Sequence, residues 1–122
     1  MPGTILIVED EAHLASLLSD VLQAAGYDVV LATPGRAAER VVETTPSAIV
    51  MDYLMPGLNG AQVVEQIREI MPDRPPPVIL VTGLSNAREL AGKVGADAYL
   101  RKPFDVDKLV SLVNQFVAES KA

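Results

Sequence analysis

Five polar residues stand at or just after the ends of short apolar runs, where a buried strand would leave a sheet: Glu9, Asp10, Asp52, Thr82 and Lys102. A carboxylate at the end of a buried run loses hydration, which is costly unless the charge is paired or hydrogen-bonded. Asp52 is the clearest case, because it follows the apolar residues 48–51 and precedes a Pro56-Gly57 turn signal. It is therefore either a turn residue or part of a charged site.

Three of these five residues are carboxylates, which suggests a metal site. Three carboxylates in one place ionise together only when a cation neutralises them. Oxygen ligands without His or Cys favour a hard cation, and a small site that keeps bound waters suits Mg²⁺ (with Mn²⁺ as the alternative) better than Ca²⁺. Glu9 and Asp10 could instead cap the following helix, whose dipole favours acids at its start. That alternative leaves Asp52, on a different strand, unexplained.

Thr82 and Lys102 add the groups that phosphoryl transfer needs. The transition state of this reaction spreads charge over three equatorial oxygens, so positioning and electrostatic stabilisation dominate catalysis. Mg²⁺ would hold one oxygen, Lys102 a second, and the Thr82 hydroxyl with nearby backbone N–H groups a third. Asp52 is then the predicted nucleophile, because a carboxylate can attack phosphorus and form an aspartyl phosphate. A simple ion pair between Lys102 and the acids is the plainer alternative.

Features of the whole sequence narrow the class of protein. Neither G-x-G-x-x-G nor G-x-x-x-x-G-K-[ST] occurs, so we expect the phosphoryl donor to be a protein or a small phosphorylated molecule. The net charge is −6 and the ten Lys and Arg residues are scattered, which argues against direct nucleic-acid binding. Cysteine, a membrane-length apolar run and a basic leader are all absent from the sequence, which predicts a soluble cytoplasmic protein with no membrane partner.

Short apolar runs alternate with segments of helical period along the 122 residues. The predicted strands are 4–8, 28–32, 48–51, 78–81 and 97–100. Apolar residues spaced three and four apart predict a helix after each strand. Capping residues predict where the later helices begin, namely at Thr33-Pro34, Asn59, Ser85 and Asp105. Gly26 is well placed to end the first helix, and Pro75–Pro77 are interpreted as a stiff loop rather than a polyproline ligand.

Strands that are separated by helices cannot form hairpins, so the sheet is predicted to be parallel and covered on both faces. The expected fold class is α/β, a three-layer, doubly wound (βα)5 sheet with strand order 2-1-3-4-5, as in flavodoxin. We expect one domain over residues 1–122, with its core at 4–119. Ligands of this fold bind outside the carboxyl ends of the strands, between the first and the third. The five polar residues would meet there.

A specific match to a known family rests on four segments: ILIVEDE, MDYLMPGLNG, VILVTG and YLRKPF. Together they resemble the receiver domain of two-component response regulators over residues 4–119. The resemblance implies a phospho-acceptor switch in a phosphorelay, not an enzyme that turns over outside substrates. A histidine kinase or histidine phosphotransfer protein would phosphorylate Asp52. The surface of the fourth helix, fifth strand and fifth helix would then bind an output protein or effector domain.

The resemblance also assigns the predicted metal site and the acceptor. Glu9, Asp10 and Asp52 would bind Mg²⁺ together with the backbone carbonyl of Leu54, and Asp52 would accept the phosphoryl group. Glu9 stands where the family often has aspartate, and receivers commonly use a Glu-Asp pair. The apolar Leu54 side chain flanks the path of attacking water, so it would affect the lifetime of the aspartyl phosphate.

Further roles follow for the residues of the last two strands. Thr82 and Lys102 would bind the phosphoryl group, and Leu84 would flank the water path. Tyr99 occupies the family's aromatic switch position, which turns inward when Thr82 shifts toward the phosphoryl group. The bond before Pro103 is usually cis in the family. The short spacing between Thr82 and Lys102 predicts a short helix over 86–94.

Two other functions fit parts of the pattern. An aspartate-nucleophile phosphatase uses a similar sheet, but usually carries a second acid two residues after the nucleophile, where this chain has Leu54. A docking module that has lost phosphorylation would not need the complete set of acids, threonine and lysine. The chain is expected to be a stand-alone regulator or a receiver cut from a larger regulator or hybrid kinase, and the Met1 start favours the first.

Overall fold

A computed structural model describes residues 3–54 and 59–120, and within these ranges strands and helices alternate. Their bounds are β1 Thr4–Val8, α1 Ala12–Ala24, β2 Asp28–Ala32, α2 Ala37–Thr44, β3 Ala48–Asp52, α3 Gly60–Ile70, β4 Val78–Thr82, α4 Ala87–Val94, β5 Ala98–Arg101 and α5 Val106–Ser120. β3 and β4 are each one residue longer than predicted, so Asp52 and Thr82 are the last residues of strands. The predicted Pro56-Gly57 turn lies outside the described residues.

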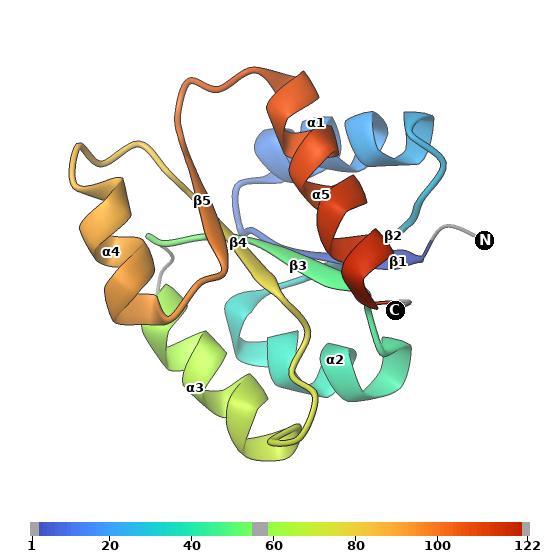
Figure 1. Cartoon of the computed structure of the whole chain (residues 1–122), viewed down its shortest axis with the longest axis vertical. Helices are drawn as coiled ribbons and strands as arrows, with labels where there is room; N and C mark the ends of the chain where they lie inside the picture. The colour runs from blue at the N-terminus through green and yellow to red at the C-terminus, as the bar shows by residue number, and fades with distance from the viewer. Residues whose placement is uncertain (1–2, 55–58, 121–122) are drawn as a thin grey trace.

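The strands form one parallel sheet in the order β2-β1-β3-β4-β5, which confirms the predicted fold class (Figure 1). The register aligns Ile7 of β1 with Val50 of β3, and Val50 with Ile79 of β4. β1 and β3 are neighbours although α1, β2 and α2 lie between them in the sequence. The winding of the chain reverses between them, which makes this boundary the expected ligand site.

Helices cover both faces of the sheet, with α1 and α5 on one face and α2, α3 and α4 on the other (Figure 1). Successive residues of β1 alternate between the two layers. Ile5 and Ile7 pack toward α1 and α5, whereas Leu6 and Val8 pack toward the opposite helices. All four are fully buried. Because both faces are covered, the inner strands need continuous apolar runs, which is the pattern that the sequence shows.

Side-chain caps appear at two of the predicted helix starts. Asn59 and Gln62 form a capping box at α3, in which Gln62 N–H donates to Asn59 Oδ1 at 3.0 Å and Asn59 N–H donates to Gln62 Oε1 at 2.9 Å. At α5, Asp107 N–H donates to Asp105 Oδ1 at 2.9 Å. Gly26 follows the last turn of α1 with a φ of 100°, a conformation that glycine adopts without a steric penalty. These signals were local and did not depend on the tertiary structure.

Two other predicted caps lack a side-chain capping bond. Thr33 stands at the cap position before Pro34, as predicted, but Pro34–Arg36 form a 3-10 turn in which Arg36 N–H donates to the Thr33 carbonyl at 3.1 Å. The α2 helix begins only after this turn, at Ala37. Ser85 does not cap α4, whose start is preceded by Asn86 without a side-chain capping bond.

The start of β5 also differs from the prediction. β5 begins at Ala98, because the Asp97 carboxylate accepts a hydrogen bond from Val78 N–H at 2.8 Å and links the entrances of β4 and β5. The short α4 agrees with the prediction from the spacing of Thr82 and Lys102. No helix in the described ranges has the length and apolarity needed to cross a bilayer.

The proline run before β4 is part of the scaffold. Pro76 is buried, and the Pro77 carbonyl accepts a hydrogen bond from Ile49 N–H at 2.9 Å. A run that is engaged in this way cannot present a free polyproline helix to a partner. The stiff-loop interpretation is therefore the one that the structure supports.

Candidate functional site

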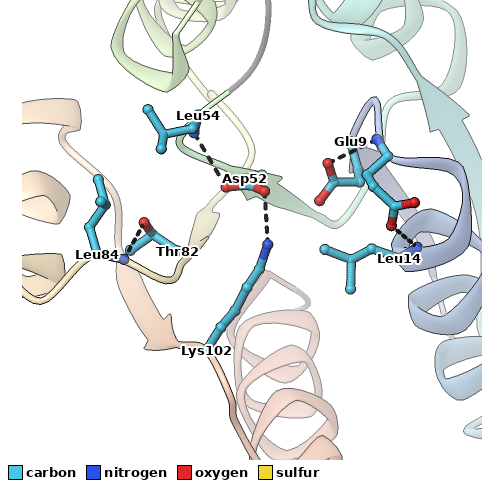
Figure 2. Close-up of polar contacts among 8 residues, drawn as sticks. Glu9, Leu14, Asp52, Leu54, Thr82, Leu84 and Lys102 are labelled. Carbon is cyan, nitrogen blue, oxygen red and sulfur yellow. Dashed lines mark hydrogen bonds and ion pairs between the residues drawn. The ribbon is translucent and has the colours of Figure 1, made fainter.

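The carboxyl ends of the strands bring four of the predicted residues to one edge of the sheet (Figure 2). Asp52 and Thr82 are the last residues of β3 and β4, while Glu9 and Lys102 directly follow β1 and β5. Parallel strands place all of these ends on the same side. Figure 2 shows the Lys102 side chain reaching Asp52, with Thr82 and Glu9 on either side.

Asp52 is held by two donors. Lys102 Nζ lies 2.9 Å from Asp52 Oδ2, and the two side chains are 30% and 13% exposed. The second carboxylate oxygen, Oδ1, accepts a hydrogen bond from Leu54 N–H at 3.3 Å. The 2.9 Å contact between Lys102 and Asp52 is a charge-assisted hydrogen bond, which is strong and orients both side chains. The simple ion pair that was the plainer alternative for Lys102 is therefore present. Its partner is Asp52, the predicted nucleophile.

Thr82 links the ends of β4 and β5 and is buried. Its Oγ1 accepts a hydrogen bond from Leu84 N–H at 3.2 Å. Its carbonyl accepts from Lys102 N–H at 2.7 Å. A hydroxyl can donate one hydrogen bond as well as accept, so this one can still donate to an oxygen at the sheet edge.

Glu9 is a buried carboxyl beside a second carboxylate. It is 8% exposed, and its Oε2 accepts a hydrogen bond from Glu11 N–H at 3.2 Å. The pKa of Glu9 is raised to about 7, chiefly by burial; the charge and hydrogen bond of Asp52 add to this rise, while Glu11 N–H and Lys102 oppose it. Additional positive charge at this point would favour ionisation of both carboxyls.

Asp10 is exposed, unlike Glu9, and lines a hollow of about 430 Å³ beside the start of α1. Within residues 3–54 and 59–120, no three Asp, Glu or His side chains lie close enough together to hold a metal ion. The predicted cluster of three carboxylates is thus not gathered at one point, and the Asp10 side chain is exposed to water. The donor set still fits Mg²⁺, since two carboxyls are adjacent and a third lies on the same loop.

The acid that caps α1 is Glu11, which the sequence analysis did not single out. Its carboxylate accepts hydrogen bonds from Leu14 N–H at 2.6 Å and His13 N–H at 3.1 Å. These two hydrogen bonds lower the pKa of Glu11, and the bond from Leu14 N–H has the larger effect. Glu11 therefore takes the capping role considered for Glu9 and Asp10. Its position directly before the first helical residue is the only signal that could have identified it.

The predicted switch residue Tyr99 lies on β5, and the predicted cis proline, Pro103, follows that strand. Tyr99 is aligned with Leu80 of β4, which places it on the sheet face that α4 covers, and its side chain is 40% exposed. The Lys102-Pro103 peptide bond is cis, as the resemblance implies. Leu54 and Leu84 contact the site through their backbone N–H groups, as described above.

A family model for the response regulator receiver domain matches residues 5–114. The chain belongs to this family. The matched range includes all of the strands except the first residue of β1, Thr4, and all of the predicted site residues from Glu9 to Lys102. The receiver is accordingly a signalling domain of two-component regulatory systems.

Two relatives show how much of a longer protein the receiver represents. It is 35% identical over 112 residues to the response regulator ArlR of Staphylococcus saprophyticus, an overlap of 89% of this chain and 50% of that protein. It is 37% identical over 114 residues to the response regulator MprA of Mycolicibacterium vanbaalenii, covering 91% of this chain and 48% of that one. The receiver thus spans about half the length of the curated relatives it matches.

Solved structures agree with the fold over nearly the full chain. A putative response regulator from Chloroflexus aurantiacus superposes with a TM-score of 0.84 at 32% identity, covering 97% of this chain and 99% of that one. The receiver domain of sensor histidine kinase PA1611 from Pseudomonas aeruginosa superposes with a TM-score of 0.86 at 28% identity, with the same coverage. That structure has a magnesium ion coordinated in its active-site cleft.

Proposed function

We propose that this receiver is a phospho-acceptor switch in which a partner histidine transfers its phosphoryl group to Asp52. The observation that carries the proposal is the 2.9 Å contact between Asp52 Oδ2 and Lys102 Nζ at the carboxyl edge of the sheet. It joins a nucleophilic carboxylate to a cation that can stabilise phosphoryl oxygens. The donor would be a histidine kinase or a histidine phosphotransfer protein, in keeping with relatives named response regulators.

In the transfer step, a carboxylate oxygen of Asp52 attacks phosphorus while the bond between phosphorus and the partner's imidazole nitrogen breaks. The imidazole keeps the bonding electron pair and takes up a proton. Lys102 Nζ then binds a phosphoryl oxygen, and the Thr82 hydroxyl donates to another. Leu54 N–H continues to orient the carboxylate that carries the new bond. Positioning and charge stabilisation of this kind account for most of the catalysis in phosphoryl transfer.

Mg²⁺ is the proposed cofactor, with Mn²⁺ as the alternative ion. The groups that would hold it are the carboxylates of Glu9, Asp10 and Asp52 and the carbonyl of Leu54. When bound, the ion would neutralise these acids and the charge on the phosphoryl oxygens. The Leu54 side chain offers no acid or base for hydrolysis, so the receiver is proposed to act once per phosphorylation and not as a phosphatase of outside substrates.

The output would depend on the hydrogen bond between Thr82 and Leu84. A Thr82 hydroxyl that turns toward the phosphoryl group would give up Leu84 N–H, which lies on the loop that leads to α4. Tyr99 would then turn inward, and the surface of α4, β5 and α5 would change. This is a shift between two conformations of the receiver, driven by phosphorylation.

The receiver itself is proposed to act in the cytoplasm and to bind no nucleic acid. A DNA-binding response regulator, MtrA of Mycobacterium leprae, is 34% identical over 116 residues, which cover 93% of this chain and 50% of that protein. Its name describes the whole protein. The net charge of −6 on this receiver supports a protein partner for the output.

The decisive experiment is phosphorylation of the purified receiver by acetyl phosphate with Mg²⁺, followed by intact mass spectrometry. The wild type is expected to gain one acid-labile phosphoryl group, whereas Asp52→Asn gains none because the amide is not a nucleophile. Asp20→Asn is the matched control, since Asp20 is an exposed acid on α1 outside the site. Equal phosphorylation of Asp52→Asn and the control would rule out Asp52 as the acceptor.

A further inference from the structure

The receiver carries nine Lys and Arg residues within its described ranges, and most are engaged by other groups. Five of them form an ion pair or a side-chain hydrogen bond: Arg36, Arg40, Arg68, Lys93 and Lys102. Among the residues that the structure describes, the other four side chains have no such partner: Arg74, Arg88, Arg101 and Lys108. Three of these four side chains lie at one edge of the molecule: Arg88, Arg101 and Lys108.

The strand β5 forms the centre of this edge, between α4 and α5 (Figure 1). Leu100 packs into the layer of α1 and α5, so the residues before and after it point the other way. Tyr99 and Arg101 therefore lie together on the side of α4, and both are exposed. An exposed aromatic ring beside a free guanidinium can contact an apolar and an acidic group at once.

The helix α4 contributes Arg88 to the same side. Lys93 lines a hollow against α3 and pairs with Glu89 at 3.7 Å, which identifies the flank of α4 that faces α3. Five residues of α-helix separate Arg88 from Lys93, a rotation of about 140° around the axis. Arg88 is exposed and lies on the flank that faces away from α3, toward β5.

The helix α5 contributes Lys108 from the opposite side of β5. Leu109 and Val113 form the buried seam of this helix, and Asn114 accepts a hydrogen bond from the hydroxyl of Tyr27, which follows α1. Lys108 is six residues before Asn114, about 120° away around the helix. It therefore lies on the flank turned away from α1, toward β5.

Acids close to these cations in the sequence already have partners. Glu89 pairs with Lys93, Asp97 accepts from Val78 N–H, and Asp105 accepts from Asp107 N–H. The neighbour of Lys108, Asp107, is one residue along the helix and does not face it. Among the residues that the structure describes, no acid forms an ion pair with Arg88, Arg101 or Lys108.

We propose that the basic edge, defined as Arg88, Tyr99, Arg101 and Lys108, binds an acidic segment of a partner protein. Carboxylates of the segment would pair with the three cations, and an apolar side chain would pack on Tyr99. A nucleic acid or anionic membrane needs a broader positive surface than three cations on a chain of net charge −6. A second copy of the receiver docked through the same edge would bring like charges together. The proposal rests on the proposed function in one respect: the basic edge is part of the output surface of α4, β5 and α5.

Two triple variants that each remove three positive charges provide the test. One removes the cations of the basic edge: Arg88→Ser, Arg101→Ser and Lys108→Ser. The matched control removes three paired cations outside it: Arg36→Ser, Arg40→Ser and Lys93→Ser. Binding of a labelled peptide of Glu and Leu to the full chain is measured by fluorescence anisotropy without phosphoryl donor. A peptide of Lys and Leu, a DNA duplex and phosphatidylserine vesicles are measured in parallel.

The basic-edge triple variant is expected to bind the acidic peptide roughly tenfold more weakly, from three exposed pairs of ordinary strength. The control triple variant should change affinity by less than about twofold, and the peptide should shift amide NMR signals of α4 and β5. Equal losses of peptide affinity in both triple variants would overturn the proposal. Tighter binding of DNA or vesicles than of the acidic peptide would also overturn it. Unchanged far-UV circular dichroism and thermal unfolding show that the variants fold. Because binding is measured without phosphorylation, failure of Asp52 as the acceptor would leave this test intact.

Discussion

The two ends of the sheet differ in what their polar groups do. The amino edge has a hollow of about 710 Å³, lined in part by Pro75–Pro77 and Asp97, which is larger than the one of about 430 Å³ beside Glu9 and Asp10 at the carboxyl edge. At the amino edge, however, polar groups satisfy the backbone: Asp97 accepts from Val78 N–H, and Ser47 N–H donates to the Thr4 carbonyl at 2.8 Å.

At the carboxyl edge, polar side chains face one another. Asp52 is paired with Lys102, and Glu9 lies against Asp52 with its pKa raised to about 7, chiefly by burial. Like charges kept together at a cost are typical of a site that acts on a ligand. The comparison teaches that the size of a hollow is a poor guide to function here, and that charged side chains which contact one another are the better guide. Substitutions at the carboxyl edge should therefore affect phosphorylation, and those at the amino edge should affect stability.

The largest effect is expected for Lys102→Ala at the carboxyl edge. Loss of the ammonium that contacts Asp52 removes the stabilisation of a phosphoryl oxygen, so the rate of phosphorylation by acetyl phosphate should fall about 100-fold. The rate is measured by intact mass spectrometry at saturating Mg²⁺. Lys93→Ala is the control, because it removes an exposed lysine paired only with Glu89. Similar phosphorylation rates for the two variants would contradict the assignment of phosphorylation to the carboxyl edge.

At the amino edge, Gly95→Ala should destabilise the receiver by about 2 kcal/mol without changing phosphorylation. Gly95 has a φ of 78°, and a Cβ there would meet the guanidinium of Arg68. Gly92→Ala is the matched control within α4, because a Cβ there meets nothing within 4 Å. It should stabilise the fold by up to about 1 kcal/mol, since alanine has the higher helix propensity. Urea unfolding of both variants measures the difference, and shifts of the same sign would contradict the assignment.

A smaller loss of stability is expected for Asp97→Ala. Val78 N–H would lose its acceptor, which should lower the free energy of unfolding by about 1 kcal/mol. Asp97→Asn keeps an acceptor oxygen at the same place and should lose less. Chemical unfolding compares the three proteins, and acetyl phosphate labelling checks that the rate at Asp52 is unchanged. A phosphorylation defect in Asp97→Ala with normal stability would reverse the roles assigned to the two edges.

The smallest effect concerns Glu11, which belongs to the carboxyl edge but has a structural role. Its pKa in the folded state is lowered by the N–H groups that it caps, so its ionised form adds stability above the unfolded pKa of about 4.5. That contribution is lost as the pH falls through the lower, folded pKa. Wild type should therefore melt at a higher temperature than Glu11→Gln at pH 7, and the gap should close in acid. A gap that is independent of pH would show that the charge of Glu11 does not contribute.

Local sequence signals predicted the parts of the fold that depend on local physics. The capping box of Asn59 and Gln62 and the glycine after α1 were readable because each signal lies within a few residues of its effect. The side-chain caps expected at Thr33 and Ser85 are not formed. Pro34–Arg36 form a 3-10 turn before α2, and Asn86 rather than Ser85 directly precedes α4, differences that a capping pattern does not reveal.

By itself, the sequence determined the alternation of strands and helices, the order of the sheet and the edge at which Glu9, Asp52, Thr82 and Lys102 meet. Apolar runs and helical spacing are sufficient for this, because a parallel sheet leaves few alternatives. Only the tertiary structure decided that Asp10 is exposed and that the Glu9 carboxyl is buried with a raised pKa. It also decided that Arg88, Arg101 and Lys108 share an edge, where no described residue forms an ion pair with them. These properties depend on burial and on distances between residues far apart in the chain, which no local pattern encodes.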